Sequence, residues 1–251
     1  MNRALPRPTA LGLTAVVFDL DGVLTRTATL HAAAWAALFD GYLRARAERT
    51  GTPFRPFDRA TDYLTWVDGK PRYDGVAAFL ESRGIRLPWG DPADPPEAET
   101  VCGLGNRKNA LFRDVLAREP VEVFPGALRF ITACREAGIA RALCSSSKNA
   151  RAILEKAGLT ALFDAVVDGV HAAEHGLPGK PAPDTFLAAA RMVGAEPSRA
   201  AVVEDAVVGV QAGRAGGFAL VIGIDRGAGA ETLRHHGADI VVTDLGDFER
   251  V

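Results

Sequence analysis

One stretch near the start of the chain decides the fold, Ala15-Val16-Val17-Phe18-Asp19-Leu20-Asp21-Gly22. Its first four residues form a short apolar run that is typical of a buried strand. Such a strand delivers two carboxylates, Asp19 and Asp21, at its carboxyl end, which is the edge of an open α/β sheet where ligands bind. Carboxylates this close repel each other unless a cation or a proton lies between them. Under a hard divalent metal ion, the first acid can act as a nucleophile while the second moves protons.

The rest of the chain alternates between strand and helix patterns. Glycines follow the helical patterns where a C′ glycine would end a helix. This alternation predicts a Rossmann-like α/β core, a parallel sheet covered by helices on both faces. The expected strands are residues 14–18, 140–144, 165–167, 200–203, 219–222 and 240–242, and the expected helices are 127–137, 149–157, 185–193 and 207–215.

Residues 27–120 interrupt this rhythm. They begin with a long helical pattern at 30–49, contain a Pro/Asp-rich segment at 87–96, and show no convincing buried strand. We therefore expect a mainly helical cap domain at 27–120, inserted into a catalytic core made of residues 1–26 and 121–251. An insertion directly after the catalytic strand would lie over the site as a cap.

The composition is that of a globular protein. The chain has 251 residues, of which 48% are hydrophobic and 24% charged, with a net charge of -2. This charge gives no sign of a nucleic-acid partner, and no apolar stretch reaches the roughly 18–20 residues that span a bilayer. Residues 1–9 lack the apolar segment of a signal peptide. The three cysteines lack metal-type spacing, so we expect buried packing residues in a reducing cytoplasm.

Further polar motifs follow the expected strands or precede the expected helices. A serine-rich turn after residue 144 could hold a phosphate, although alone such a turn is more often a helix N-cap. Lys180 precedes a helix whose start fits Asp184 as N-cap, and a lone Lys-Pro pair is only a loop signal. Glu204 and Asp205 form a second acidic pair, and two such pairs on different strands favour a hard-cation site over a helix cap. The turn is Ser145-Ser146-Ser147-Lys148-Asn149.

Together these motifs resemble the haloacid dehalogenase (HAD) superfamily of phosphotransferases, in the right order and over essentially the whole chain. The resemblance implies that Asp19 is the nucleophile that becomes an aspartyl phosphate, and that Asp21 is the general acid/base. It implies that Ser145 and Lys180 bind the transferring phosphoryl group, with Lys180 also damping repulsion between carboxylates. It also implies a Mg²⁺ ion held by Asp19, the Asp21 carbonyl, Glu204 and Asp205. The acid at position 21 argues against a dehalogenase, because those enzymes lack it.

Further motifs narrow the resemblance: the run Asp21-Gly22-Val23-Leu24-Thr25-Arg26-Thr27 followed by His31 and Trp35, with Gly69-x-x-Arg72 and Arg107-Lys108-Asn109 in the expected cap. These motifs resemble β-phosphoglucomutases, in which a glucose 1,6-bisphosphate must turn round in the closed site. That family implies that Gly69, Arg72 and Lys108 of the cap, and Ser146, Ser147, Lys148 and Asn149 of the core, bind the sugar and its distal phosphate. His31 would help to align Asp21. The chain departs from the mutase pattern at Arg26 and Asp68, and its cap is longer. This longer cap resembles domains found beside or fused to disaccharide phosphorylases, which implies a functional partnership with such an enzyme; some relatives with it are described as trehalose-phosphate phosphatases.

Several of these residues have simpler explanations. His31 could be a surface or core histidine of an alanine-rich helix, and Arg107-Lys108 could lie on a solvated helix face. Trp35 is expected to pack within the cap. The aromatic residues expected to form the core of the cap are Phe54, Phe57, Tyr63 and Trp66.

Three functions compete. The preferred one is a β-phosphoglucomutase that acts as a monomer on a small sugar phosphate. The second is a sugar-phosphate phosphatase, for example acting on trehalose 6-phosphate or a hexose phosphate, with the same Asp19 intermediate but water as acceptor. A catalytically silent binding module is the third, and the complete set of acids with Ser145 and Lys180 argues against it.

Overall fold

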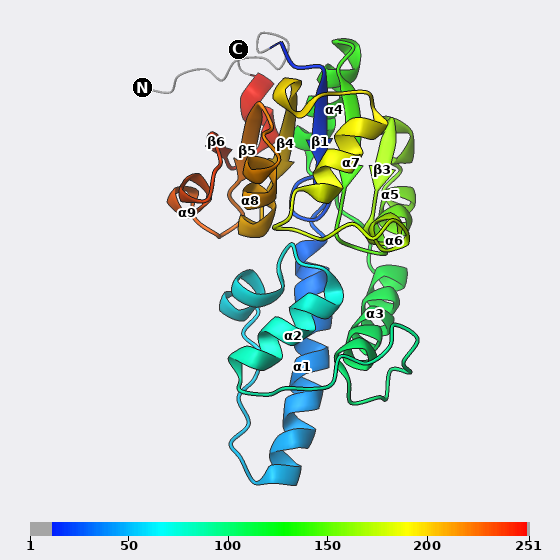
Figure 1. Cartoon of the computed structure of the whole chain (residues 1–251), viewed down its shortest axis with the longest axis vertical. Coiled ribbons are helices and arrows are strands. Elements are labelled where there is room, and N and C mark those ends of the chain that lie inside the picture. Colours follow the sequence, from blue (N-terminus) through cyan, green and yellow to red (C-terminus); the bar gives the residue numbers. More distant parts are fainter. Residues whose placement is uncertain (1–11, 250–251) are drawn as a thin grey trace. The chain divides into compact units, whose positions relative to one another are not determined.

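The structure, a computed structural model, describes residues 12–249 (Figure 1). The chain divides into two compact units, a core unit of residues 1–26 and 121–251 and an insert unit of residues 27–120. The segment 1–9, from which we predicted the lack of a signal peptide, lies outside the described residues.

The core unit is built on a six-stranded parallel sheet with the strand order β3-β2-β1-β4-β5-β6. Three of the predicted strands are observed without change, and the others differ by one or two residues at one or both ends. This confirms the predicted α/β fold class. The strands are β1 (Ala15–Phe18), β2 (Ala140–Cys144), β3 (Ala165–Val167), β4 (Ala200–Glu204), β5 (Leu220–Ile224) and β6 (Ile240–Val242).

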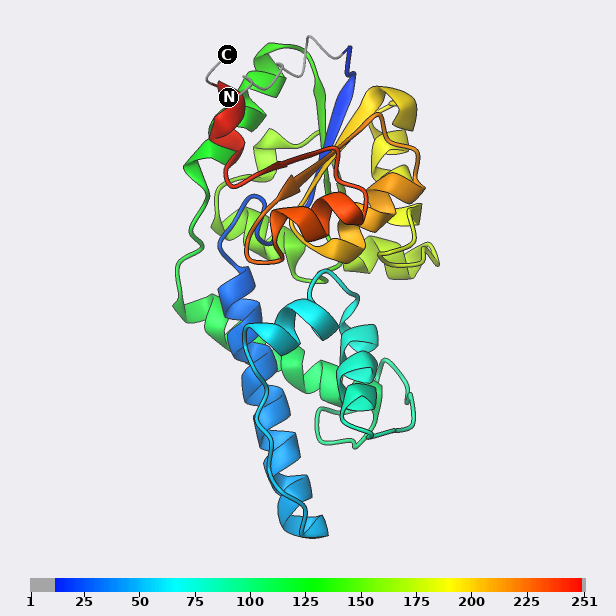
Figure 2. The same cartoon turned by 90° about the vertical axis from the view of Figure 1, so that its left-hand side faces the viewer.

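Both faces of the sheet are covered by helices, as Figures 1 and 2 show. Alternate strand residues point to opposite faces, so Val17 packs in one cluster with Phe186 of helix α7 and Val210 of helix α8. On the other face the Phe18 ring meets Phe130 of helix α4 edge to face, with 6.0 Å between ring centroids. The core helices are α4 (Pro125–Glu136), α5 (Ala150–Lys156), α6 (Gly169–Glu174), α7 (Asp184–Met192), α8 (Val207–Ala215) and α9 (Ala230–His235).

The start of helix α7 differs from its prediction. Pro183 occupies the N-cap position and Asp184 is the first helical residue. The Asp184 carboxylate lies in the first turn, where it interacts favourably with the positive end of the helix dipole instead of capping it. An acid is favoured both at the N-cap and in the first turn of a helix, so sequence spacing alone could not tell which of the two positions Asp184 occupies.

The insert unit contains helices and no strand, and all of its residues are described. Phe39 lies at the centre of its apolar core, with ring centroids 4.0 Å from Phe79 and 5.2 Å from Trp35. The predicted packing roles of Trp35, Phe57 and Tyr63 are confirmed, because all three are buried in this cluster. Phe54 and Trp66 lie partly buried against it. The helices are α1 (Ala28–Thr50), α2 (Arg72–Ser82) and α3 (Val101–Arg118), with a π-helical turn at Tyr63–Val67.

Two further predictions concern single features. The three cysteines, Cys102, Cys134 and Cys144, are buried and form no disulfide, so their assignment as packing residues is confirmed. Among the residues that the structure describes, no helix is both long and apolar enough to cross a membrane.

Candidate active site

The site lies where the direction of the strand order reverses. From β1 the chain adds β2 and β3 on one side, and then β4, β5 and β6 on the other. Such a reversal leaves a crevice at the carboxyl ends of the two central strands, β1 and β4. Asp19 directly follows β1, and β4 ends at Glu204, with Asp205 next. The two predicted acidic pairs therefore come from adjacent strands of one sheet edge.

Lys180 joins the two acidic pairs. Its Nζ donates to Asp19 Oδ1 at 2.5 Å and to Glu204 Oε2 at 3.2 Å. The three side chains are almost fully buried, with the lysine side chain 1% exposed. The ammonium group also lies 4.7 Å from the centre of the Phe186 ring, which attracts cations. The predicted role of Lys180 between carboxylates thus has a direct geometric basis.

Burial and charge act on this cluster in opposite directions. Burial raises the pKa of Asp19, the Lys180 ammonium lowers it, and the carboxylate of Asp21 raises it again, with a net shift upward. Burial alone would lower the pKa of Lys180, but Asp19 and Glu204 outweigh this effect and raise it. Lys180 therefore stays cationic, and without it the buried Asp19 would be harder to ionise.

The carboxylates can hold a metal ion. Asp19, Glu204 and Asp205 are buried, and each offers an oxygen such that the three oxygens lie within 4.8 Å of one another. An all-oxygen anionic set is the kind that Mg²⁺ prefers. Two glycines leave room for these acids: a Cβ on Gly22 would lie 1.8 Å from Asp205 Oδ2, and one on Gly209 would lie 2.1 Å from the Glu204 carboxyl carbon.

The serine-rich turn starts next to Asp19. Strand β2 pairs with β1, so Ser145 follows the neighbouring strand at the same edge, and it is buried. Its Oγ accepts a hydrogen bond from the Ser147 backbone N–H at 3.1 Å, and Ser147 Oγ accepts one from the Asn149 N–H at 3.1 Å. Ser146 is half-buried and Lys148 is exposed. Side-chain hydroxyls therefore shape the turn, whereas the N-cap position of α5 is occupied by Asn149, whose side chain makes no capping hydrogen bond there.

Two predicted residues meet inside the insert unit. His31 of α1 and Lys108 of α3 are both buried, and Lys108 Nζ lies 2.7 Å from His31 Nδ1. The His31 ring stacks on Phe112 at 3.9 Å between centroids. An ammonium group only donates, so a protonated Lys108 requires His31 Nδ1 to be the acceptor in this contact. The alternative that Lys108 lies on a solvated helix face is wrong.

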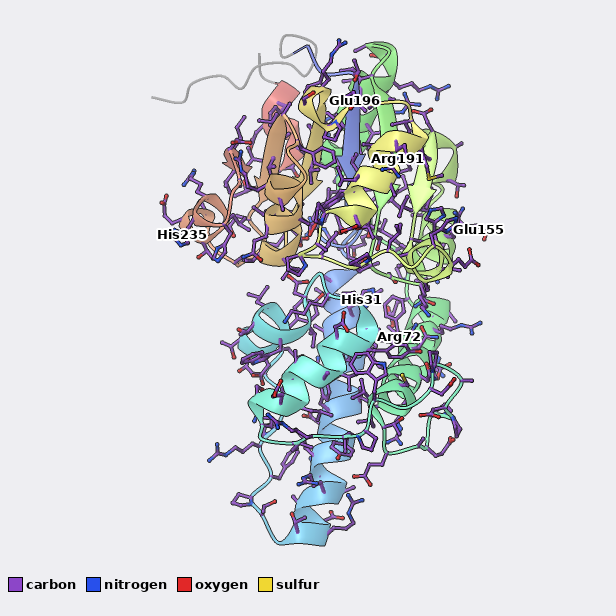
Figure 3. All side chains as sticks on the ribbon, viewed as in Figure 1. His31, Arg72, Glu155, Arg191, Glu196 and His235 are labelled. Atoms are coloured by element: carbon purple, nitrogen blue, oxygen red, sulfur yellow. The ribbon has the colours of Figure 1, made fainter. Side chains whose placement is uncertain are left out.

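The other predicted residues of the insert unit lie around the start of α2. Figure 3 labels Arg72, whose Nη1 approaches the Gly105 carbonyl of α3 at 3.4 Å. Burial lowers the pKa of Arg72. Gly69, three residues earlier, has a φ of 69°, a backbone conformation that favours glycine. The substrate-binding roles of Gly69 and Arg72 stay predictions.

The structure adds two residues that the sequence analysis did not select. Arg226 follows β5, and its Nε donates to the Gly22 carbonyl at 2.7 Å. Asp168 follows β3, is 1% exposed and caps helix α6 by accepting from the backbone of Val170 and His171. Asp168 is the first residue after β3 and Arg226 is the second residue after β5, at the same sheet edge as the site. A systematic search for polar residues at every strand end would have found them.

Comparison with known proteins agrees with this geometry. The family model described as haloacid dehalogenase-like hydrolase matches residues 13–217. A β-phosphoglucomutase of Mycobacterium tuberculosis is 54% identical over 237 residues, which make up 93% of this chain and 90% of that protein. The chain therefore belongs to the HAD superfamily. Within it, the chain is a member of the β-phosphoglucomutase-like family and an enzyme of the HAD type.

Two further relatives of this HAD enzyme extend the picture. A second Mycobacterium tuberculosis protein, named as an uncharacterised glycosyl hydrolase, is 41% identical over 92% of this chain, which matches only 17% of that longer protein. The crystal structure of a β-phosphoglucomutase from Clostridium difficile superimposes with a TM-score of 0.74 at 24% identity, covering 93% of this chain and 92% of that one. The latter likeness establishes the shared fold.

Proposed function

We propose that this enzyme is a Mg²⁺-dependent β-phosphoglucomutase that converts β-glucose 1-phosphate to glucose 6-phosphate. The observation that carries the proposal is the buried Asp19–Lys180 contact beside the carboxylates of Glu204 and Asp205. This arrangement suits a carboxylate nucleophile in phosphoryl transfer. The near full-length 54% identity to a β-phosphoglucomutase favours a sugar as the acceptor over water.

In the first half-reaction, the sugar accepts the phosphoryl group. Asp21 removes the proton from the 6-hydroxyl of β-glucose 1-phosphate as that oxygen bonds to the phosphorus of the Asp19 aspartyl phosphate. The bond between phosphorus and the Asp19 carboxylate oxygen breaks, and glucose 1,6-bisphosphate forms. Ser145 and Lys180 bind the transferring group. When bound, Mg²⁺ would neutralise charge on the transferring phosphoryl oxygens, with Asp19, the Asp21 carbonyl, Glu204 and Asp205 as its proposed ligands.

The second half-reaction requires the bisphosphate to turn round. The Asp19 carboxylate then attacks the phosphorus on the 1-oxygen, the bond to that oxygen breaks, and Asp21 returns the proton to it. The products are glucose 6-phosphate and phosphorylated enzyme. We propose that Gly69, Arg72 and Lys108, with Ser146, Ser147, Lys148 and Asn149, bind the distal phosphate and the sugar in each orientation, and that His31 aligns Asp21.

The proposal includes a supplier of substrate. Inverting phosphorolysis of an α-linked glucose disaccharide releases β-glucose 1-phosphate, so a disaccharide phosphorylase is the partner that this enzyme needs. The match to a segment of a longer protein named as a glycosyl hydrolase supports this pairing.

Phosphorus-31 NMR tests the function. Purified protein is incubated with Mg²⁺, β-glucose 1-phosphate and a trace of glucose 1,6-bisphosphate. We expect glucose 6-phosphate to accumulate, the bisphosphate to shorten the lag, and inorganic phosphate to stay low. The α-anomer and the Asp19→Asn variant serve as controls and should give no product. Growth of inorganic phosphate at the rate of substrate loss would instead identify a sugar-phosphate phosphatase.

A further inference from the structure

Arg226 connects three separate parts of the core unit. Its Nε donates to the Gly22 carbonyl at 2.7 Å, and its Nη1 donates to the Thr243 carbonyl at 2.8 Å. The guanidinium carbon also lies 3.7 Å from the centre of the Phe124 ring. A planar guanidinium can use its edge for hydrogen bonds while its face lies on an aromatic ring. Arg226 therefore has a fixed position and orientation.

Phe124 belongs to one of the two linkers that join the core unit to the insert unit. It is buried, and a second guanidinium, that of Arg26, lies 4.5 Å from its ring centre. The two linkers are held together by backbone contacts within the core unit. These contacts are Arg26 N to Glu122 O at 2.9 Å, Phe124 N to Leu24 O at 2.9 Å, and an antiparallel bridge between Thr25 and Val123.

The Gly22 carbonyl is part of the Gly22–Val23 peptide bond, the next peptide bond along the chain after Asp21–Gly22. Gly22 has a φ of 82°, and its N–H donates to the Thr25 carbonyl at 2.8 Å, which closes a tight turn. Arg226 donates to the carbonyl of the same residue. With both groups of Gly22 bound, the backbone on which Asp21 is carried has little freedom. Arg226 also interacts electrostatically with the Asp205 carboxylate.

We propose that Arg226 is a positioning residue for Asp21. It anchors the turn that carries this acid to the paired linkers through Phe124, and so keeps the carboxyl group in line with the bond that breaks. The inference rests on the proposed function, in which Asp21 moves the proton in both half-reactions. It assigns a task to a residue of the β5–α9 loop and explains why an arginine, and not a lysine, stands there: a lysine could reach one carbonyl but could not bind two and stack on the ring.

The test compares Arg226→Gln, Arg226→Lys and the control Arg214→Gln. Arg214 makes the same type of contact elsewhere in the core unit, with its Nη2 donating to the Gly237 carbonyl at 2.8 Å. We expect Arg226→Gln to lower kcat by roughly tenfold to a hundredfold, the range expected for a misplaced catalytic group. KM should change little, because the phosphate-binding groups lie on other elements, and the Tm of each variant shows how far the lost contacts of Arg226 and Arg214 lower stability. Arg226→Lys should recover part of the rate, and Arg214→Gln should retain it.

Amide hydrogen exchange gives a readout that does not depend on the reaction. The N–H groups of Gly22, Leu24 and Thr25 are hydrogen-bonded within the turn. They should exchange faster in Arg226→Gln than in wild type, and at the wild-type rate in Arg214→Gln. A kcat within twofold of wild type, or an equal loss in both variants, would overturn the proposal.

The two proposals can fail separately. If the wild-type enzyme releases inorganic phosphate instead of glucose 6-phosphate, the proposed function fails. The same variants are then compared by the rate of phosphate release, which also depends on Asp21, and the same loss supports the role of Arg226.

Discussion

At the scale of single residues, the proposed chemistry depends on one buried contact. Lys180 and Asp19 are separated by 161 positions in the chain, yet their side chains lie 2.5 Å apart with almost no exposure to water. Isolated, the Asp19 carboxylate would be strongly destabilised by burial. The lysine offsets that penalty and shares its charge with Glu204. The lysine thus counteracts the effect of burial on the pKa of Asp19, the group that we propose as the nucleophile.

This balance predicts how Asp19 titrates. Its pKa is raised by burial, the Lys180 charge opposes the rise, and removal of that charge must therefore raise the pKa further. In metal-free protein, carbon-13 NMR of labelled aspartates should show Asp19 titrating above the ordinary value of about 3.9. The Lys180→Met variant should move its midpoint to higher pH. An unchanged or lower midpoint in that variant would contradict the assigned contact.

Gly22 provides a second test at this scale. Alanine at this position would carry an unfavourable positive φ, and its Cβ would strike the Asp205 carboxylate. Gly138 has a φ of 70° with open space around it, so it isolates the backbone cost. Both Gly→Ala variants should lose about 1–2 kcal/mol in unfolding free energy from backbone strain. Only Gly22→Ala should also lose most of its activity. Denaturant unfolding and the phosphorus-31 assay measure the two effects, and equal activities would refute the close packing.

At the scale of elements, the strands were easier to predict than the groups that complete the site. Three apolar runs coincide with β2, β3 and β6 because short buried strands of a parallel sheet are continuous apolar segments. Asp19, Glu204 and Asp205 could be placed from the apolar runs predicted for β1 and β4, because Asp19 follows β1, Glu204 ends β4 and Asp205 comes next. Lys180 could not, because it lies in a loop before α7, and only the family resemblance selected it.

The turn between β2 and α5 predicts the effect of a neighbouring glycine. Gly169, at the start of α6, donates its N–H to the Ser147 carbonyl at 3.1 Å, and a Cβ there would lie 2.5 Å from the Ser146 carbonyl oxygen. Gly169→Ala should displace the backbone of the turn and raise KM for the sugar phosphate by about tenfold. Gly41→Ala on helix α1 is the control, because its site is open, and it should leave KM unchanged. Steady-state kinetics measures KM for each protein. Identical KM values for Gly169→Ala and wild type would exclude a role of the turn in binding the sugar phosphate.

At the scale of the whole molecule, the sequence predicted which charged residues belong to the site, but not which of their side chains contact one another. The acids were expected to need a cation, and the structure supplies one, Lys180, before any metal is considered. The family resemblance selected His31 and Lys108 for different roles and did not indicate that they are paired. Their contact inside the insert unit results from the packing of α1 against α3. Arg226 was missed because a single arginine near the end of an expected strand gives only a weak sequence signal, and its contact with Gly22 exists only in the folded chain.

The shared cluster also predicts how stability responds to Mg²⁺. An ion bound to the native state and not to the unfolded chain adds about 2.7 kcal/mol when present at a hundred times its Kd. For a chain of this size that corresponds to a rise in Tm of about 5–10 °C. The net charge is only -2, so general screening should add little, and NaCl of matched ionic strength is the control.

The Asp205→Asn variant links this response to the site. Asp205 belongs to the group of three buried acids whose oxygens lie within 4.8 Å of one another, so its charge should contribute to holding the ion. The variant should fold but lose most of the Mg²⁺-dependent rise in Tm, whereas Asp239→Asn, which removes a partly exposed acid paired with Arg214, should keep it. Differential scanning calorimetry with Mg²⁺ or EDTA measures both. A wild-type response in Asp205→Asn would place the ion elsewhere and remove the metal from the proposed chemistry.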